Sequence, residues 1–370
     1  MTGTRPGTEQ TVESGMRDPV RVAVVGCGWW ATTAHLPAVM ADKRAELVAV
    51  VEPDEDRLQA ARAAFGHPAA YRDVGSMLSD ISPDAVVIAT PPNFHYEAAK
   101  LALTSGAHVL IEKPMVLASS DGAKLLELAR SRGRSIVVGY PYHYNAQAAY
   151  IRSRIRQGTI GAFEFASVLF ASVARSLYSG TPEDYSQAFG YGMTGPLPTS
   201  YSDPAIAGGG QGQAQVTHSA ALLLWLTGQE VESVSAVTFS AGLAVDLADA
   251  GCVRFRSGAV ATLAATGGVI ETQPEMLEYR IFGSAGHIVW DVYGETGTIA
   301  TRAGTEALQV HAPVGGYPMA APVQNLIGLA RGDGENQSPG ELGLATVELL
   351  DCMYRSASSG AHVPVSAVRR

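Results

Sequence analysis

A lysine that directly follows an apolar run is the residue of this sequence best placed to do chemistry. The residues Glu112-Lys113-Pro114 close the run from Ala107 to Ile111. Long charged side chains are seldom buried without a partner, and open α/β sheets bind ligands at the carboxyl ends of their strands. If the run is a strand of such a sheet, Lys113 lies at that edge. We therefore interpret Lys113 as a functional residue rather than a solvated charge.

A glycine pattern near the start of the chain indicates such a sheet. The apolar run from Val20 to Val25 is followed by Gly26-Cys27-Gly28-Trp29-Trp30-Ala31, which fits G-x-G-x-x-A between a strand and a helix. Glycines at these positions permit a tight turn and a close approach of the backbone to a pyrophosphate at the helix N-terminus. We therefore expect dinucleotide contacts from Gly26, Gly28, Trp29 and Trp30.

Glu52 ends the next apolar run, from Leu47 to Val51. An acidic side chain at this place can accept hydrogen bonds from the adenosine ribose and repels a 2′-phosphate, so the sequence predicts NAD in preference to NADP. The alternative is that Glu52 is a surface carboxylate before the turn Pro53-Asp54.

Strand and helix patterns alternate up to Gly139. A helix is expected over 54–65, a strand over 85–89, a strand ending at Ile111, a helix from about Ser119 to Arg130 and a strand over 135–139. Between them, the loop Thr90-Pro91-Pro92-Asn93-Phe94-His95 is rigid because of its two prolines, and Asn93 is expected to cap the helix that runs to Thr104. This repetition predicts a parallel, doubly wound sheet.

The pattern changes after Gly139. Alternating runs over 162–172, 231–240, 250–256, 259–265, 278–282 and 287–293 predict a mostly antiparallel sheet with one covered face. The stretch from Leu177 to Gly212 carries Tyr178, Tyr191 and Tyr201 and is expected to be a lid or an oligomer contact. Another aromatic group begins where the sixth strand ends, and one or two of its members are expected to face the substrate: Tyr140, Tyr142, His143 and Tyr144.

Composition limits the classes of protein that remain. A formal net charge of −9 argues against nucleic-acid and anionic-membrane partners, and no apolar run reaches the roughly eighteen residues of a membrane span. The three cysteines form no metal-ligand or redox pattern. We expect no metal site, reduced thiols and a cytoplasmic protein. The polar residues 1–19 are expected to be a disordered leader.

Taken together, the motifs resemble those of the Gfo/Idh/MocA oxidoreductases, the relatives of glucose–fructose oxidoreductase and inositol dehydrogenase. The resemblance runs from Val20 to about Val365. It rests on the glycine pattern, Thr90-Pro91-Pro92-x-x-His95, Glu112-Lys113-Pro114, Gly208-Gly209-Gly210 with His218 eight residues later, and the Ser338-Pro339 start of the last helix. Through these motifs the resemblance adds Thr90, Pro91, Asn93, His95, Glu112 and Lys113 to the expected cofactor site, with Lys113 in contact with the nicotinamide ribose.

The resemblance implies a fold and an activity. It implies an NAD-binding Rossmann domain over 20–140 and a substrate-binding α/β domain over 141–370, whose last helix, 339–357, can pack back on the first domain. The open, mostly antiparallel sheet of the second domain would support a homodimer or homotetramer. The implied reaction is reversible, NAD-dependent oxidation of a secondary hydroxyl of a sugar, glycoside or cyclitol.

Within that reaction, the resemblance gives Lys113 and His218 the catalytic roles. The unperturbed pKa of histidine suits His218 as the base that removes the hydroxyl proton. Lys113 would stabilise the alkoxide, or act as the base itself if burial depresses its pKa. For His218 the alternative is a buried helix histidine beside Leu222 and Trp225.

One position departs from the family pattern. The family usually has an aspartate four residues before the histidine, and this chain has Ala214 there, flanked by glutamines. Gln213 can hydrogen-bond sugar hydroxyls but cannot take up a proton. The departure keeps open a second function, glycoside cleavage through transient oxidation by bound NAD. A third is a dinucleotide-sensing regulator without catalysis, because fold does not fix function, but the presence of Lys113 and His218 counts against it.

Overall fold

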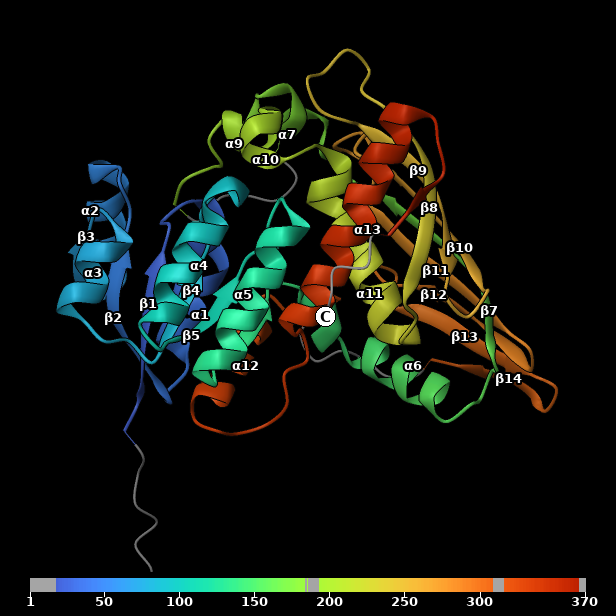
Figure 1. Cartoon of the computed structure of the whole chain (residues 1–370), viewed down its shortest axis with the longest axis horizontal. Coiled ribbons are helices and arrows are strands. Elements are labelled where there is room, and N and C mark those ends of the chain that lie inside the picture. The colour runs from blue at the N-terminus through green and yellow to red at the C-terminus, as the bar shows by residue number, and fades with distance from the viewer. Residues whose placement is uncertain (1–17, 184, 186–192, 309–315, 366–370) are drawn as a thin grey trace, which may run out of the picture.

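The computed structural model describes residues 18–183, 185, 193–308 and 316–365, which form two β-sheets with helices around and between them (Figure 1). Residues 1–17 of the expected leader and Tyr191 of the expected lid lie outside the described residues. None of the helices in the described ranges combines the length and the apolar character that a bilayer crossing requires.

The first sheet confirms the predicted parallel, doubly wound topology. Its six strands lie in the order β3-β2-β1-β4-β5-β6, and every neighbouring pair is parallel. The strands are β1 Val20–Val25, β2 Ala45–Val51, β3 Ala69–Tyr71, β4 Ala85–Ile88, β5 His108–Ile111 and β6 Ile136–Val138. Because β1 lies in the middle and the chain winds outward on both sides, the ends of β1, β4 and β5 meet at one edge. The short strand β3 carried no pattern that predicted it.

Helices cover both faces of this sheet. Its helices are α1 Leu36–Ala41, α2 Glu55–Ala64, α3 Val74–Asp80, α4 His95–Thr104 and α5 Ser119–Arg132. Leu58 of α2 packs on one face, and Leu103 of α4 packs on the other. The expected cap at Asn93 is wrong. A 3₁₀ turn, Pro92–Phe94, precedes α4, whose N-terminal cap position is Phe94 with no side-chain hydrogen bond.

The second sheet is mostly antiparallel, as predicted, and has nine strands in the order β14-β13-β12-β11-β7-β10-β9-β8-β15. Only the central pair β7–β10 is parallel. The strands are β7 Phe163–Ala171, β8 Val231–Phe239, β9 Ala248–Phe255, β10 Val260–Thr266, β11 Met276–Gly283, β12 Gly286–Asp291, β13 Thr296–Thr301, β14 Gly304–Ala307 and β15 Val363–Pro364. Burial alternates strictly along β9, so one face of the sheet is covered.

Helices α11 Thr217–Thr227 and α13 Gly340–Ser359 lie between the two sheets (Figure 1). Helix α6 Ala146–Arg156 packs on α11, and α12 Ala321–Ala330 packs on strands β4, β5 and β6 of the first sheet. Leu344 and Val347 of α13 pack into the core of the first sheet, whereas Leu350 and Met353 pack into that of the second. Helix α12, which the sequence did not predict, also packs on the first sheet through Leu326. The two halves are therefore joined by shared helices as well as by the chain.

Candidate active site

A cavity of about 850 Å³ lies where the carboxyl edge of the first sheet meets the second half of the chain. The first half contributes the glycine loop and the turn after β5. The second half contributes Gln213 from the turn before α11 and His218 from α11 itself, together with several tyrosines. The structure thus brings Lys113 and His218, which lie far apart in the sequence, to one cavity.

The glycine loop after β1 fits a dinucleotide pyrophosphate. Gly26 has φ +90°, and a Cβ there would lie 2.7 Å from the carbonyl oxygen of Ala89, so only glycine fits. A Cβ on Gly28 would meet no atom within 4 Å, and Gly28 lines the cavity. The backbone at Gly28 is therefore open to a ligand at the start of the helical segment Ala31–Ala41, and Trp29 and Trp30 line the cavity beside it.

Glu52 lies at the end of β2 and lines the same cavity. Its Oε2 accepts a hydrogen bond from the Cys27 N–H at 2.9 Å, and its Oε1 accepts one from the Arg57 guanidinium at 2.8 Å. The side chain is buried, which argues against a surface carboxylate. Sequence reasoning missed Arg57, because an arginine on an amphipathic helix carries no signal of its own.

The loop after β4 contains residues that line the cavity and a buried histidine that does not. Thr90 and Pro91 line the cavity, but Asn93 is exposed and does not. His95 is fully buried, and its ring nitrogens lie 2.9 Å from the carbonyl oxygens of Pro114 and Thr90. The expectation that Asn93 and His95 contact the cofactor is therefore not supported by their positions. His95 instead joins the Thr90 loop to the turn that follows β5.

The turn after β5 holds Glu112 in a set of hydrogen bonds. Glu112 Oε1 accepts from Trp30 Nε1 at 3.0 Å and lies 2.9 Å from His35 Nε2, and Oε2 accepts from the Lys113 N–H at 3.1 Å. Burial acts to raise the pKa of Glu112, but the hydrogen bond and charge of His35 and the charge of Lys113 outweigh it, so the pKa is lowered. Glu112 is therefore an anion that positions Trp30 and the Lys113 backbone.

Lys113 reaches across to the second half of the molecule. Its Nζ donates a hydrogen bond to the carbonyl oxygen of Ala214 at 2.9 Å, and the Lys113–Pro114 peptide bond is cis. Burial lowers the pKa of Lys113, and the Glu112 carboxylate partly opposes this. The lysine thus lies on the cavity wall with its Nζ bound to a neutral backbone acceptor, and the alanine side chain at 214 offers no carboxylate beside it.

His218 is buried at the base of the cavity among aromatic rings. The rings of Tyr142, Tyr140 and Tyr317 lie edge-on to its imidazole, with centroids 5.6, 5.9 and 6.1 Å away. Burial, and then the charge of Lys113, lower its pKa well below the ordinary value. The Nδ1 atom is buried with no hydrogen-bond partner among the described residues. His218 is therefore a neutral imidazole that can accept a proton.

Of the aromatic group after β6, the structure brings only Tyr142 to the cavity wall. Tyr140 lies behind it, with its hydroxyl 3.1 Å from Thr217 Oγ1, and the Tyr144 hydroxyl donates to Asn325 Oδ1 at 2.9 Å. Tyr140 and Tyr144 are thus not placed to touch a substrate, because the 3₁₀ turn Pro141–Tyr144 points its side chains in different directions.

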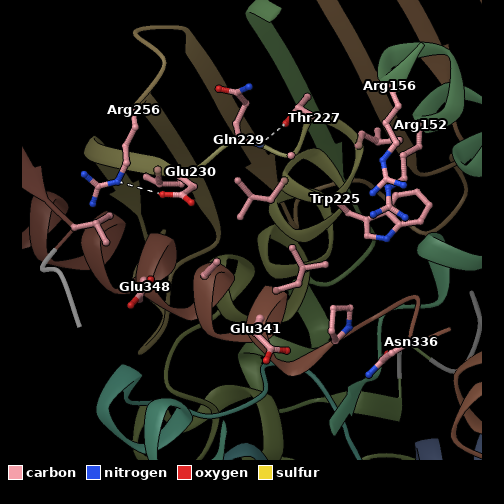
Figure 2. A pocket seen from close by; sticks show the side chains of 18 residues that line it. Arg152, Arg156, Trp225, Thr227, Gln229, Glu230, Arg256, Asn336, Glu341 and Glu348 are labelled. Atoms are coloured by element: carbon pink, nitrogen blue, oxygen red, sulfur yellow. Dashed lines mark hydrogen bonds and ion pairs between the residues drawn. The ribbon is translucent and has the colours of Figure 1, made fainter. Parts of the chain in front are cut away.

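His143 does not line this cavity, and its neighbour Trp225 lies on the wall of a second one. Its ring stacks on Trp225 with centroids 5.2 Å apart, and Arg152 lies 3.9 Å from the same indole ring. Figure 2 shows Arg152 and Trp225 together on the wall of this second cavity, which has a volume of about 710 Å³. Burial and the charge of Arg152 lower the pKa of His143 to about 3, so the ring is neutral. The expected substrate contact of His143 is not supported.

The structure places the remaining predicted residues as follows. Gln213 lines the cavity as expected, and its side-chain oxygen has no partner among the described residues. Of the expected lid tyrosines, Tyr201 lines the cavity, whereas Tyr178 is buried and donates to Gln211 at 2.9 Å. Sequence reasoning missed residues whose place in the fold is set by long-range packing. These are His35, which binds Glu112 from the helical turn Ala31–His35, and the cavity-lining residues Tyr185, Glu275, Tyr293 and Tyr317.

Two family models match the chain. The oxidoreductase model Gfo/Idh/MocA, with an NAD-binding Rossmann fold, matches residues 20–140, and the Gfo/Idh/MocA C-terminal domain matches residues 149–289. Together these regions cover most of the chain, and the solved structures that share the fold include complexes with NAD and NADH.

The chain is also similar to individual proteins. It is 28% identical to D-glucoside 3-dehydrogenase of Escherichia coli (strain K12) over 43% of this chain and 44% of that protein. It is 33% identical to dTDP-3,4-didehydro-2,6-dideoxy-alpha-D-glucose 3-reductase of Streptomyces violaceoruber over 42% of this chain and 46% of that protein. The chain thus spans less than half the length of these curated relatives. The WlbA dehydrogenase of Bordetella pertussis, solved with NADH and UDP-GlcNAcA, superposes with a TM-score of 0.74 at 25% identity, over 94% of this chain and 99% of that chain.

Proposed function

The chain belongs to the Gfo/Idh/MocA oxidoreductase family, and from this premise we propose that it is an NAD-dependent dehydrogenase. Its reaction is the reversible oxidation of a secondary hydroxyl of a sugar, glycoside or cyclitol. The observation that carries this proposal is that Lys113 and His218, from opposite halves of the chain, line one cavity with the glycine loop. We propose further that residues 20–140 form the NAD-binding domain and residues 141–370 the substrate domain.

The cofactor is held by the first half of the molecule. Gly26 lets the loop pack closely on Ala89, and Gly28 leaves the backbone open to the pyrophosphate. Glu52 lies at the end of β2, where it can accept hydrogen bonds from the ribose. Thr90 and Pro91 line the cavity between that point and Lys113. When bound, NAD supplies the acceptor for the hydride that leaves the carbinol carbon.

His218 and Lys113 carry out the proton transfer and stabilise the charge on the reacting oxygen. In the oxidation, the neutral His218 takes up the proton of the reacting hydroxyl at Nε2, because its Nδ1 is buried. The Lys113 ammonium donates a hydrogen bond to the same oxygen as it becomes a carbonyl and stabilises the negative charge that develops on it. Tyr142 and Tyr317 hold the imidazole in place through their ring edges.

The test is a turnover screen of monosaccharides, glycosides and cyclitols with NAD⁺ and with NADP⁺, followed by NADH or NADPH absorbance. Formation of NADH with at least one substrate, in proportion to the ketone produced, supports the proposal. Release of a sugar from a glycoside without accumulation of NADH would support NAD-dependent glycoside cleavage instead. Tight NAD binding with no product from any class of substrate would favour a dinucleotide-sensing regulator.

The uncovered face of the second sheet supports an oligomer. Its strands expose large apolar side chains on one side, namely Leu169, Val237, Phe239, Val260, Met276, Phe282 and Val289. Monomers seldom expose so many large apolar groups on one face, and the same face of a second copy would cover them with two-fold symmetry. We propose a homodimer or homotetramer through this sheet. The three free cysteines suit a reducing compartment, and we propose the cytoplasm.

A further inference from the structure

Glu275 lines the cavity from the segment that joins β10 to β11. Its Oε1 accepts a hydrogen bond from the Val173 N–H at 2.9 Å, which fixes the side chain against the neighbouring strand end. The other carboxylates on the cavity wall already have partners. Glu52 is bound by Arg57, Glu112 by His35, Glu97 by Lys100, and Asp73 caps α3 through the Ser76 N–H.

The charge of Glu275 is not neutralised by the protein. Burial raises its pKa, and the interactions with the Val173 N–H and the Tyr293 hydroxyl oppose this without outweighing it. No lysine, arginine or histidine of the described ranges contributes to this balance. A half-buried carboxylate without a cation beside it is costly for a protein to keep, and a cationic group on a ligand would reduce that cost.

Aromatic rings surround the same carboxylate. Burial raises the pKa values of Tyr142, Tyr293 and Tyr317, and the charge of Glu275 raises all three further, so these hydroxyls lie within its field. The Tyr142 ring lies 4.8 Å from that of Tyr317 and 6.3 Å from that of Tyr293, centroid to centroid. Aromatic rings attract cations to their faces, and they also pack on the apolar face of a sugar ring.

We propose that Glu275 and these three tyrosines bind a protonated amino group, so that the substrates are amino sugars or glycosides that carry one. This inference rests on the proposed dehydrogenase function and names its substrate class. The ammonium pairs with the Glu275 carboxylate, and the neighbouring rings shield the pair from water. His218 and Lys113 then meet a hydroxyl of the same molecule, because they line the same cavity.

The experiment compares matched neutral and charged sugars on the full chain saturated with NADH. The probes are methyl glucoside, each of its amino-deoxy isomers, and the N-acetyl derivative of each isomer, with dissociation constants measured by calorimetry near neutral pH. We expect at least one amino isomer to bind about tenfold tighter than both its N-acetyl derivative and the parent glucoside, the factor of one charge-assisted hydrogen bond.

Two glutamine variants locate the charge. Glu275→Gln keeps the acceptor for the Val173 N–H and should abolish the preference for the amine, with NADH affinity unchanged as evidence of folding. The matched control Glu271→Gln removes one charge from an exposed position of the same segment and should retain the preference. Equal binding of amine and N-acetyl probes by the unaltered protein, or a preference that survives Glu275→Gln, overturns the inference.

The outcomes also separate this inference from the proposed function. Oxidation of neutral glycosides with NAD⁺, with no preference for any amine, would retain the dehydrogenase and reject the ammonium site. Selective binding of amines that depends on Glu275, with no NADH formed from any probe, would retain the ammonium site and reject the dehydrogenase.

Discussion

The ammonium of Lys113 donates a hydrogen bond to the carbonyl oxygen of Ala214 at 2.9 Å, across the boundary between the two halves of the chain. In the family pattern an aspartate side chain occupies the position of Ala214. Here the acceptor is a backbone carbonyl, which orients the lysine without adding a negative charge. The charge of the Glu112 carboxylate opposes the lowering of the lysine pKa by burial, and we propose that the ammonium stabilises an alkoxide in the cavity.

Replacement of Lys113 by alanine should remove that stabilisation. We expect kcat to fall by about a hundredfold or more, while the dissociation constant of NADH, measured by fluorescence, changes little. Lys100→Ala, at an exposed position of α4, is the control. Unchanged turnover in Lys113→Ala would remove the catalytic assignment.

Replacement of His218 by asparagine should remove the proton acceptor and lower kcat by about a hundredfold or more. The pH profile offers a second measurement. Because the pKa of His218 is lowered by burial and by Lys113, its neutral form persists below the usual histidine range. The acid limb of kcat/KM in the unaltered enzyme should therefore lie below pH ~6.5. A limb centred on the ordinary histidine pKa would contradict the buried, neutral imidazole.

Glu52→Ala should weaken the preference for NAD over NADP. The substitution removes the carboxylate that would repel a 2′-phosphate and frees the Arg57 guanidinium that it binds at 2.8 Å. We expect the ratio of NADH to NADPH affinities to fall by about tenfold, with Glu55→Ala on the exposed side of α2 as the control. The same ratio in Glu52→Ala and the unaltered protein would remove this role.

Asp249 should make the stability of the fold depend on pH. Burial, and then the neighbouring Asp246, raise its pKa to about 9, so the folded state keeps it protonated where the unfolded chain ionises it. The resulting loss of folding stability is absent below the unfolded pKa of 3.8 and grows as pH rises towards 9. Asp249→Asn should therefore raise the unfolding free energy at pH ~8 by about 1 kcal/mol or more, with little effect at pH ~4. Equal effects in chemical denaturation at both pH values would argue against the protonated form.

Phe282→Glu should weaken the proposed assembly. Phe282 is 38% exposed on the uncovered face of β11, and a carboxylate there would have to be buried between two copies. We expect the mass from light scattering to fall to that of one chain, while the melting temperature of the monomer is retained. Glu278→Gln on the same face is the control. An unchanged mass would place the interface elsewhere.

The fold was predictable to the extent that it depends on local pattern. The β-branched run Val20–Val25, the glycines after it and the strand and helix patterns that alternate up to Gly139 predicted the first sheet, and alternating runs predicted most of the second. Helix α12 was not predicted, because its apolar residues are buried by the distant first sheet rather than by neighbours in sequence. Strand β3 was missed because only three residues, all partly buried, pair with β2.

The candidate site was predictable where a residue follows a recognisable strand or motif. Lys113, Glu52 and Gly28 lie where their spacing placed them, and His218 reaches the same cavity. The partners Ala214, His35 and Glu275 required tertiary structure, since each approaches from a different segment. Asn93 and His143 were predicted to contact a ligand because they follow strand ends, but proximity to a strand end does not fix the direction of a side chain.

Helix α13 has a consequence for how ligands reach the cavity. Leu344 and Met353 of this one rigid helix belong to the two separate cores. A hinge that swung the halves apart would have to pull one end of α13 out of its core. Displacement of the short helices α9 Thr199–Ser202 and α10 Pro204–Ala207, whose Ser200, Tyr201 and Ala207 line the cavity, would leave α13 seated in both cores. Substrate exchange would then be controlled by that small element, and its rate could limit turnover without any motion of the catalytic residues.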